Sequence, residues 1–436
     1  MQKREGGIFY GWWIVLACFF ILVVAYGTRY YSFGVFFKPM MKEFGWTRAM
    51  TATAFTLSTI LYGVACPIIG TLVDRFGSRI VIMIGAVMGG AGFASIYLTD
   101  SIFKLYIYYS LLMSVGIAAT ALVPCNAVIA RWFVKKRSTA TGLVSAGMAV
   151  GAFIFVNLAQ WMIKTYGWRM SFVIMGIVVI VCILPIALFV IKNRPEDKGL
   201  LSDGDTTEEI PRCAEPTTIS AAPAAPAPTW TMTSAMGTFA FWCISLSYCA
   251  YLFAYGSVMV HTVPHATDIG HSAAIAAFAL SLLTGSSIIG RLSAGWLGDK
   301  INIRYAGAGF MALSGVAMFA FLIITSIKNE WLMYVFAVCF GIGYGGMTPL
   351  MAVITSKMFG TKAFGVIYGW VLLIGVIGNG VGPTITGYLY DVLGSYIWAF
   401  TICGAIALLS AVLFLLARQP KPREVPAKAP ALQSAN

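Results

Sequence analysis

The stretch Gly285-Ser-Ser-Ile-Ile-Gly-Arg-Leu-Ser-Ala-Gly-Trp-Leu-Gly-Asp-Lys300 joins an apolar segment to a charged turn. Within it, Arg291 follows about 18 residues of largely apolar helix, and a cation at such a depth in a membrane costs at least ~2.5 kcal/mol. No Asp or Glu lies in the middle of any hydrophobic segment of the chain. We therefore predict that the counter-ion of Arg291 is a ligand with a carboxylate. The alternative is an arginine that snorkels to the interface or bonds backbone carbonyls.

The composition around this stretch is that of a membrane protein. The chain has 436 residues, of which 59% are hydrophobic and 10% are charged. Apolar runs recur along the whole length, and a helix of about 20 apolar residues spans a bilayer. We predict an all-α integral membrane fold with twelve transmembrane helices. Their expected spans are 10–36, 48–69, 79–99, 102–130, 140–163, 168–192, 235–262, 272–294, 305–327, 331–356, 364–389 and 395–417.

The basic residues predict the orientation of these helices. The formal net charge is +13, which in a soluble protein would suggest a nucleic-acid partner. Here seven of the 29 Lys and Arg fall in outer loops, Arg29 and Arg291 fall within helices, and the others fall on inner segments. Loops rich in Lys and Arg stay on the cytoplasmic side of a membrane. We therefore expect a multi-pass protein of the plasma (inner) membrane with both termini in the cytoplasm.

The chain divides into two similar halves. Residues 193–234 are acidic and then Pro/Ala-rich, and such a composition predicts a largely disordered cytoplasmic linker. It separates six helices in 1–192 from six in 235–417, and residues 418–436 form a tail. The halves repeat, because Gly70-Thr-Leu-Val-Asp74-Arg75 matches Gly295-Trp-Leu-Gly-Asp299-Lys300, and Arg131-Trp-Phe133 matches Lys357-Met-Phe359. A duplicated six-helix unit is a transporter architecture, with the substrate site between the two bundles near mid-membrane.

The first copy, Gly70-x-Leu-x-Asp-Arg-Phe-Gly77-Ser-Arg79, resembles the loop signature of the major facilitator superfamily, and the second copy departs from it at Asn302. Glycines in this pattern permit close helix approach. The aspartates can pair with cations or with a helix N-terminus. We interpret the motif as a conformational latch or loop architecture, not as a substrate site. Its members are Gly70, Asp74, Arg75, Gly77, Arg79, Gly295, Asp299 and Lys300.

A second resemblance is narrower. Phe9-Tyr-Gly-Trp-Trp-Ile-Val15, the segment from Tyr26 to Phe37, and Trp132-Phe-Val-Lys-Lys-Arg137 are similar to monocarboxylate transporters and their bacterial relatives, including oxalate:formate antiporters. In that family an arginine four residues before the helix 8 glycine binds the substrate carboxylate. Arg291 and Gly295 match this spacing.

The departures from that family are informative. Animal monocarboxylate transporters carry an aspartate four residues before the arginine, where this chain has Ser287, and a lysine where it has Tyr30 or Tyr31. Oxalate carriers place a lysine in helix 11, at the position of Val371. The resemblance therefore does not carry over their proton relay, and a single buried cation suits a single carboxylate.

Other candidate residues have two readings each. Arg29 either anchors helix 1 at the outer interface or faces the cavity and steers anions inward. His261 and His265, near the end of helix 7, either carry a coupled proton or are solvated at the interface. Five more residues either contact the substrate or serve in packing. They are Asn126, Tyr344, Tyr30, Tyr31 and Tyr255.

Together these features predict a secondary transporter of small monocarboxylates such as lactate or pyruvate, proton-linked and working by alternating access. An organic-anion exchanger is the nearest alternative, and a polytopic sensor or receptor is an alternative of another class. We expect no enzyme activity, cofactor, metal or nucleic-acid partner, and we expect a monomer in the lipid bilayer.

Overall fold

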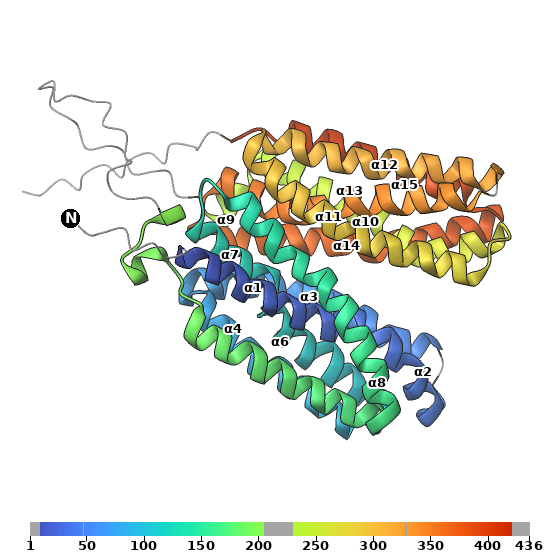
Figure 1. Cartoon of the computed structure of the whole chain (residues 1–436), viewed down its shortest axis with the longest axis horizontal. Coiled ribbons are helices and arrows are strands. Elements are labelled where there is room, and N and C mark those ends of the chain that lie inside the picture. Colours follow the sequence, from blue (N-terminus) through green and yellow to red (C-terminus); the bar gives the residue numbers. More distant parts are fainter. Residues whose placement is uncertain (1–8, 47, 205–229, 328, 421–436) are drawn as a thin grey trace, which may run out of the picture.

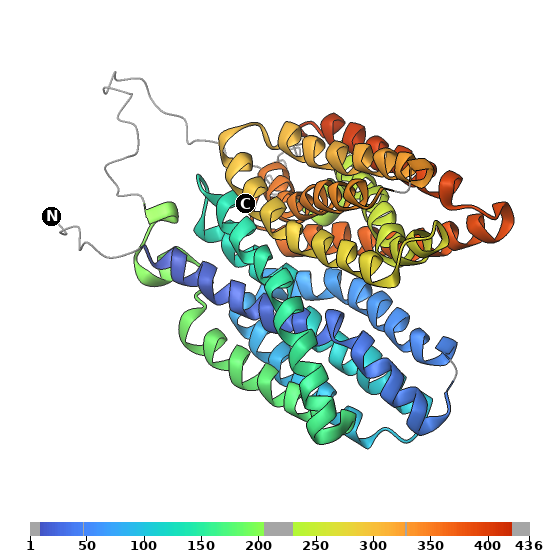
Figure 2. The same ribbon diagram turned by 45° about the vertical axis from the view of Figure 1, so that its right-hand side comes forward.

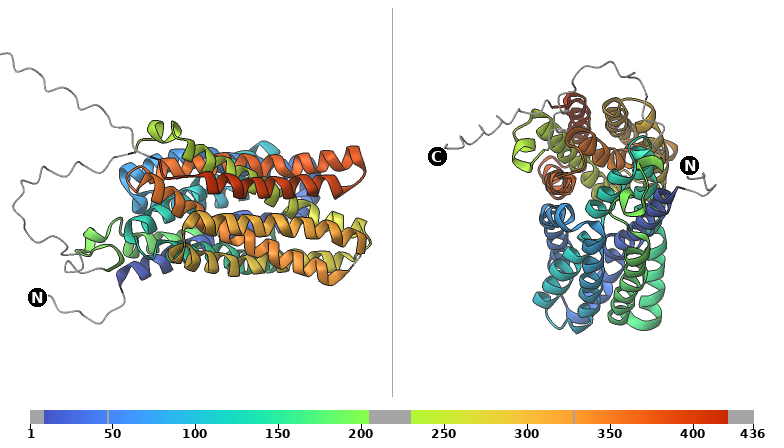
Figure 3. Two further views of the ribbon diagram at one scale, coloured as in Figure 1. Left: turned by 90° about the horizontal axis from the view of Figure 1, so that it is seen from above. Right: turned by 90° about the vertical axis from the view of Figure 1, so that its left-hand side faces the viewer.

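The structure is a computed structural model that describes residues 9–46, 48–204, 230–327 and 329–420. Within these ranges every regular element is a helix. Figure 1 shows two helical bundles, one from each half of the chain, lying side by side with their helices along the long axis of the molecule. The turned views in Figures 2 and 3 show the same separation. We call the end at which α1 begins and the linker leaves the linker end, and the opposite end the far end.

The first bundle contains the helices up to the linker. Its elements are α1 (Tyr10–Tyr26), η1 (Gly27–Tyr31), α2 (Phe33–Phe44), α3 (Arg48–Phe76), α4 (Ser78–Ser95), η2 (Ile96–Leu98), α5 (Ile102–Leu105), η3 (Tyr106–Met113), α6 (Ser114–Ala118), α7 (Leu122–Trp132), α8 (Arg137–Pro185) and η4 (Ile186–Val190). The predicted helix 102–130 is thus broken into pieces, and α1, η1 and α2 together extend beyond the predicted 10–36.

The second bundle follows the linker. Its elements are α9 (Met232–Met236), α10 (Phe239–Asp268), α11 (Ala273–Lys300), α12 (Ile303–Ile327), α13 (Glu330–Phe359), α14 (Phe364–Leu393) and α15 (Tyr396–Leu416). Short polar side chains cap several of these helices. Thr238 and Ser272, for example, accept hydrogen bonds from the N–H groups of Phe241 and Ile275.

Ten helical segments of the described chain are long and apolar enough to cross a membrane. One of them, Arg137–Val190, contains two predicted spans. They meet at Gly167, whose φ of 77° and ψ of 162° lie outside the helical region, so α8 is two helical arms joined at this glycine. The 28-residue α11 is not among the ten and corresponds to the predicted span 272–294.

The linker prediction needs a correction at its start. Residues 195–204 form two short 3-10 helices, η5 (Pro195–Lys198) and η6 (Ser202–Gly204), and they rest on the first bundle. The helix α9 likewise lies within the predicted linker. The acidic and Pro/Ala-rich core of the linker, 205–229, lies outside the described residues.

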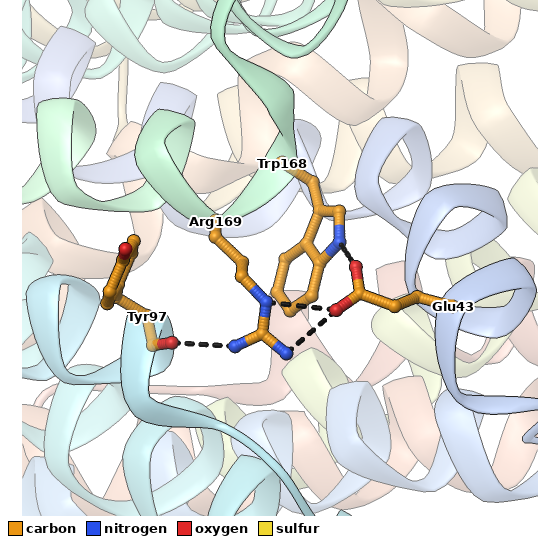
Figure 4. A network of polar contacts seen from close by, with 4 residues as sticks. All are labelled: Glu43, Tyr97, Trp168 and Arg169. Carbon is orange, nitrogen blue, oxygen red and sulfur yellow. Dashed lines mark hydrogen bonds and ion pairs between the residues drawn. The ribbon is translucent and has the colours of Figure 1, made fainter.

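At the far end, the carboxylate of Glu43 joins three parts of the first bundle (Figure 4). It accepts hydrogen bonds from Trp168 Nε1 at 2.5 Å and from Arg169 Nη2 at 2.8 Å. Arg169 Nη1 also donates to the carbonyl of Tyr97 at 2.7 Å. Burial acts to raise the pKa of Glu43, but the bonds from Trp168 and Arg169 outweigh it and hold that pKa below its usual value.

Replacing Glu43 with Gln should therefore lower thermal stability at pH 7, by less than about 1 kcal/mol because the side chain is half-exposed. A lowered pKa means that this stabilisation is present above the unfolded-state value near 4.5 and is lost as the pH falls through the folded-state value. Thermal unfolding of both proteins between pH 7 and pH 4 should show the difference shrinking. Equal melting temperatures of the two proteins at pH 7 would contradict a stabilising role for the charge of Glu43.

Candidate functional site: a buried arginine between two bundles

Arg291 lies on α11 of the second bundle and is among its most buried side chains, with 1% of its surface exposed. Its Nη1 donates to Ser287 Oγ at 3.1 Å, and Nε has no hydrogen-bond acceptor among the described residues. Ser287 is itself neutral and donates to the carbonyl of Thr284. Among the described residues, no carboxylate forms an ion pair with Arg291. The buried guanidinium thus has no acidic partner in the part of the chain that the structure describes.

An aromatic pair from two other helices covers the guanidinium. The Cζ atom of Arg291 lies 5.6 Å from the ring centroid of Tyr344 on α13. Tyr344 stacks on Tyr255 of α10, with centroids 3.8 Å apart and planes at 4°. Glycines bring α11 and α13 together, since a Cβ atom at Gly345 would overlap the carbonyl of Ser287. The structure therefore unites three predicted site residues, Arg291, Tyr344 and Tyr255.

A second polar group lies where the two bundles meet. Asn126 on α7 donates from Nδ2 to the hydroxyl of Tyr368 on α14 at 3.2 Å, across the bundle boundary. Asn126 is 3% exposed, and its Oδ1 has no hydrogen-bond partner among the described residues. Tyr248 on α10 is buried, and its ring packs against Gly375 of α14.

On the side of the first bundle, Tyr26 and Tyr62 form a second pair of tyrosines. Their hydroxyls are 3.1 Å apart. The sequence analysis named neither Tyr62, Tyr248 nor Tyr368 as a site residue. Their only sequence signal is a tyrosine inside an apolar helix, and the chain has 20 tyrosines.

The latch motif joins the two bundles at the linker end. The carboxylate of Asp74, at the end of α3, accepts the N–H groups of Gly365 and Val366 at 3.0 and 2.9 Å, at the start of α14. Arg131 Nη2 lies 3.9 Å from the same carboxylate. A Cβ atom at Gly70 would overlap the carbonyl of Gly365, so the helices touch through their backbones.

The second copy of the motif makes the mirror contact. Asp299, at the end of α11, accepts the N–H groups of Ser138 and Thr139 at 2.9 and 2.8 Å, at the start of α8. A Cβ atom at Gly295 would lie 2.9 Å from the carbonyl of Ser138. Each aspartate thus caps a helix of the opposite bundle, which agrees with the predicted attraction to a helix N-terminus. Since both contacts cross the boundary, they close the linker end in this conformation.

Comparison with known proteins agrees with this arrangement. The family model of the Major Facilitator Superfamily matches residues 18–380 and 310–435. The chain belongs to the major facilitator superfamily. Two solved members share its fold at 14% identity. The E. coli fucose:proton symporter has a TM-score of 0.66, covering 93% of this chain and 98% of that one. A proton:xylose symporter has a TM-score of 0.70, covering 95% and 97%.

Curated relatives of this superfamily member are monocarboxylate transporters. Monocarboxylate transporter 13 of Rattus norvegicus is 29% identical over 413 residues, covering 93% of this chain and 88% of the relative. Monocarboxylate transporter 12 of Homo sapiens is 26% identical over 434 residues, covering 95% and 81%. The chain is therefore a multi-pass membrane transporter of the major facilitator type, and by its family it is not an enzyme.

The structure corrects the expectation that Arg29 anchors at the outer interface. The side chain is 3% exposed, so it neither anchors at an interface nor faces solvent. Its Nη2 donates to Ser58 O and Oγ at 2.9 and 3.0 Å, Nε donates to Ser114 Oγ at 3.2 Å, and Cζ lies 4.5 Å from the Tyr62 ring centroid. In this structure the donors of Arg29 bond Ser58 and Ser114 inside the first bundle, and its role in anion steering stays a prediction.

The histidines lie apart from the arginine. His261 bonds Tyr396 Oη at 3.2 Å through Nδ1 and the carbonyl of Pro383 at 2.9 Å through Nε2. Because a carbonyl only accepts, Nε2 is the donor in its bond, and both ring nitrogens have a partner. His265 is buried and packs against aromatic rings, including those of Phe321 and Phe400. The alternative of solvated interfacial histidines is wrong for His265.

The remaining predicted residues are not brought to the Arg291 cluster. Tyr30 packs against Phe55, with centroids 5.5 Å apart. The side chain of Tyr31 lies outside those that the structure describes. In the latch motif, Arg75 lies over the neighbouring Phe76 ring, and Lys300 is exposed. Neither of these two cations forms an ion pair among the described residues, so the aspartates and glycines make the observed cross-bundle contacts.

The structure also explains why the second motif has Asn302 in place of glycine. In the first copy, Gly77 has a φ of 83°, and Asn193 Oδ1 accepts the N–H of Arg79 at 3.0 Å. In the second copy, Asn302 Oδ1 accepts the N–H of Arg304 at 3.1 Å. The same bond is therefore made by a distant asparagine in one half and by the motif itself in the other.

Proposed function

We propose that this transporter carries small monocarboxylates, lactate- or pyruvate-like, with Arg291 as the counter-ion of the substrate carboxylate. The observation that carries the proposal is a 99%-buried guanidinium with no acidic partner among the described residues. A buried charge without a partner is costly, and an anionic ligand removes that cost. The names of the curated relatives support the same substrate class.

The guanidinium is oriented to bind a carboxylate through two parallel bonds. Ser287 accepts a hydrogen bond from Nη1, and Nε, which shares the opposite edge with Nη2, has no acceptor among the described residues. A planar two-donor edge matches the two oxygens of a carboxylate. The stacked rings of Tyr344 and Tyr255 fix one face of the guanidinium and favour a substrate with a short apolar body.

The polar group across the boundary suggests which monocarboxylates fit. The unpaired Asn126 Oδ1 is an acceptor and suits the hydroxyl donor of a 2-hydroxy acid. Val371, at the position where oxalate carriers have a lysine, is completely buried among apolar residues. A second carboxylate would find no cation there, so we disfavour dicarboxylate exchange.

Transport proceeds by alternating access in this proposal, with the linker end facing the cytoplasm of an inner membrane. Opening that end requires breaking the bonds of Asp74 to α14 and of Asp299 to α8. The conformation described here is then closed to the cytoplasm. Uptake of labelled lactate, pyruvate, acetate, formate and oxalate into proteoliposomes tests the substrate class, and strong oxalate uptake without lactate uptake would refute it.

We further propose proton-linked symport in which the substrate, and not a histidine, carries the proton. Both ring nitrogens of His261 are engaged, Nε2 by the carbonyl of Pro383 and Nδ1 by the hydroxyl of Tyr396, and neither bonds Arg291. A pH gradient alone should therefore accumulate labelled substrate against its gradient. His261→Gln should keep this accumulation within about twofold, because an amide can still bond both neighbours. Loss of accumulation in a folded His261→Gln protein would mean that the histidine carries the proton. Failure of active wild-type protein to accumulate substrate would exclude symport.

A further inference from the structure

The start of the linker crosses the linker end of the first bundle as a strap, which we define as residues 193–204. Asn193 bonds Arg79 in the first latch motif, and Lys198 Nζ lies 4.9 Å from the ring centroid of Tyr10 on α1. Ser202 Oγ donates to the carbonyl of Arg131 at 3.3 Å. Figure 1 shows this segment beside the start of α1. The strap is therefore attached at several points to the helices that form the latch.

The carboxylate of Asp203 makes the most specific of these attachments. Its Oδ2 accepts the N–H groups of Val134 and Lys135 at 2.8 and 2.7 Å, and its Oδ1 accepts that of Lys136 at 3.3 Å. Three consecutive N–H groups thus converge on a single anion. Asp203 has a φ of 59°, the only positive φ outside glycine among the described residues. The backbone accepts this unfavourable conformation while the carboxylate is held in place.

The loop that Asp203 binds leads directly into the latch. Val134–Lys136 precede Ser138 and Thr139, the two residues whose N–H groups Asp299 accepts. Arg137, between the two sets, is 8% exposed and donates to the carbonyl of Phe133 and to Ser356 of the opposite bundle. Two carboxylates, one from the strap and one from the second bundle, therefore cap the same helix start.

The repeated half lacks this arrangement. Residues 360–363 form the same turn before α14 as residues 133–136 form before α8. In the part of the chain that the structure covers, no carboxylate accepts the N–H groups of residues 361–363. Among the described residues, the two halves of the latch thus differ in that a linker carboxylate caps the turn before α8 and none caps the turn before α14.

We propose that Asp203 is a positioning residue for the gate: the docked strap holds the 134–136 turn so that α8 receives Asp299, and it thereby biases the transporter toward closure at the linker end. This inference rests on the proposed alternating-access function. Undocking the strap, or neutralising Asp203, shifts the population toward opening at that end. The strap then couples events in the linker to the gate without touching the substrate site.

Hydrogen–deuterium exchange on the intact transporter in lipid nanodiscs, without substrate, tests the inference. Asp203→Gly removes the carboxylate and relieves the positive φ, and Asp203→Asn is the milder variant. Asp203→Gly should raise exchange about tenfold at the start of α8, the factor expected for losing bonds to a charged acceptor. The decisive segment is 364–370, in which Asp74 accepts the N–H groups of Gly365 and Val366 and to which no strap residue is hydrogen-bonded among the described residues. Exchange there should rise as well, because opening breaks both contacts.

Glu196→Gln is the matched control. It removes one negative charge from the same strap at an exposed side chain that makes no hydrogen bond among the described residues, and it should change neither segment. Increased exchange confined to 134–139, no increase at all, or an equal effect of Glu196→Gln would each overturn the inference. Because no substrate is used, these outcomes are independent of which anion is carried. Lactate uptake by the same variants separately tests the proposed function.

Discussion

Arg291→Ala is expected to abolish carboxylate uptake and to leave a folded protein. Removing one partner of a buried charge pair costs about 2–5 kcal/mol of binding, which is a loss of about 30-fold or more. The fold does not depend on the charge, because the guanidinium bonds one neutral serine and one aromatic face. Loss of uptake with an unchanged melting temperature would therefore place the arginine in binding and not in folding.

Arg291→Lys should also bind poorly, although it keeps the charge. A lysine has one ammonium in place of the planar edge that donates two parallel bonds, so about tenfold or more of affinity should be lost. Initial rates of labelled lactate uptake, measured over a range of concentrations, would show this as a higher KM. Lys104→Ala is a suitable control, since its ammonium pairs with Asp100 on the exposed far end. Normal transport by the alanine variant at position 291 would refute the central proposal.

Gly70→Ala should reduce transport by about tenfold or more through the gate. The added Cβ would overlap the carbonyl of Gly365, and backbone atoms of α14 cannot move aside as a flexible side chain can. Overpacking of this kind costs about 1–3 kcal/mol. The contact crosses the two bundles, so the cost falls on the state closed at the linker end and not on either bundle alone.

Gly380→Ala is the matched control for this variant. It lies on α14, and a Cβ atom there has no neighbour within 4 Å. Both substitutions gain about 1 kcal/mol of helix propensity, so a loss of uptake seen only at position 70 cannot arise from a weakened helix. Uptake rates and melting curves of both variants decide the matter. Wild-type uptake by Gly70→Ala would mean that the helices need not approach this closely during transport.

The sequence predicted the fold well because its repeat is local and strong. Asp74 and Asp299 stand in matching motifs, and the structure places each at a helix N-terminus as the electrostatics suggest. What the motif could not reveal is that each aspartate caps a helix of the opposite bundle. A pattern in one loop carries no information about which distant helix start will face it.

The candidate site was predicted in part. Arg291 stands out because a buried cation is rare and expensive, whereas Tyr248 and Tyr368 resemble any tyrosine in an apolar helix. The partners of Arg29 could not be predicted, since they are two serines on other helices, Ser58 and Ser114, and neither is near it in sequence. Asp203 was missed for a different reason. The disorder prediction rests on the average composition of the acidic linker, and this average does not reveal that one carboxylate in it binds the first bundle.

The position of Arg291 and Asp299 on one helix has a consequence for how such a transporter can diversify. Along α11 they are separated by about 12 Å, and between them Gly295 packs against α8. A rigid helix that tilts to fit a larger anion also moves the aspartate that fastens the gate. A substitution that repositions α11 is therefore expected to change substrate selectivity and the rate of opening together.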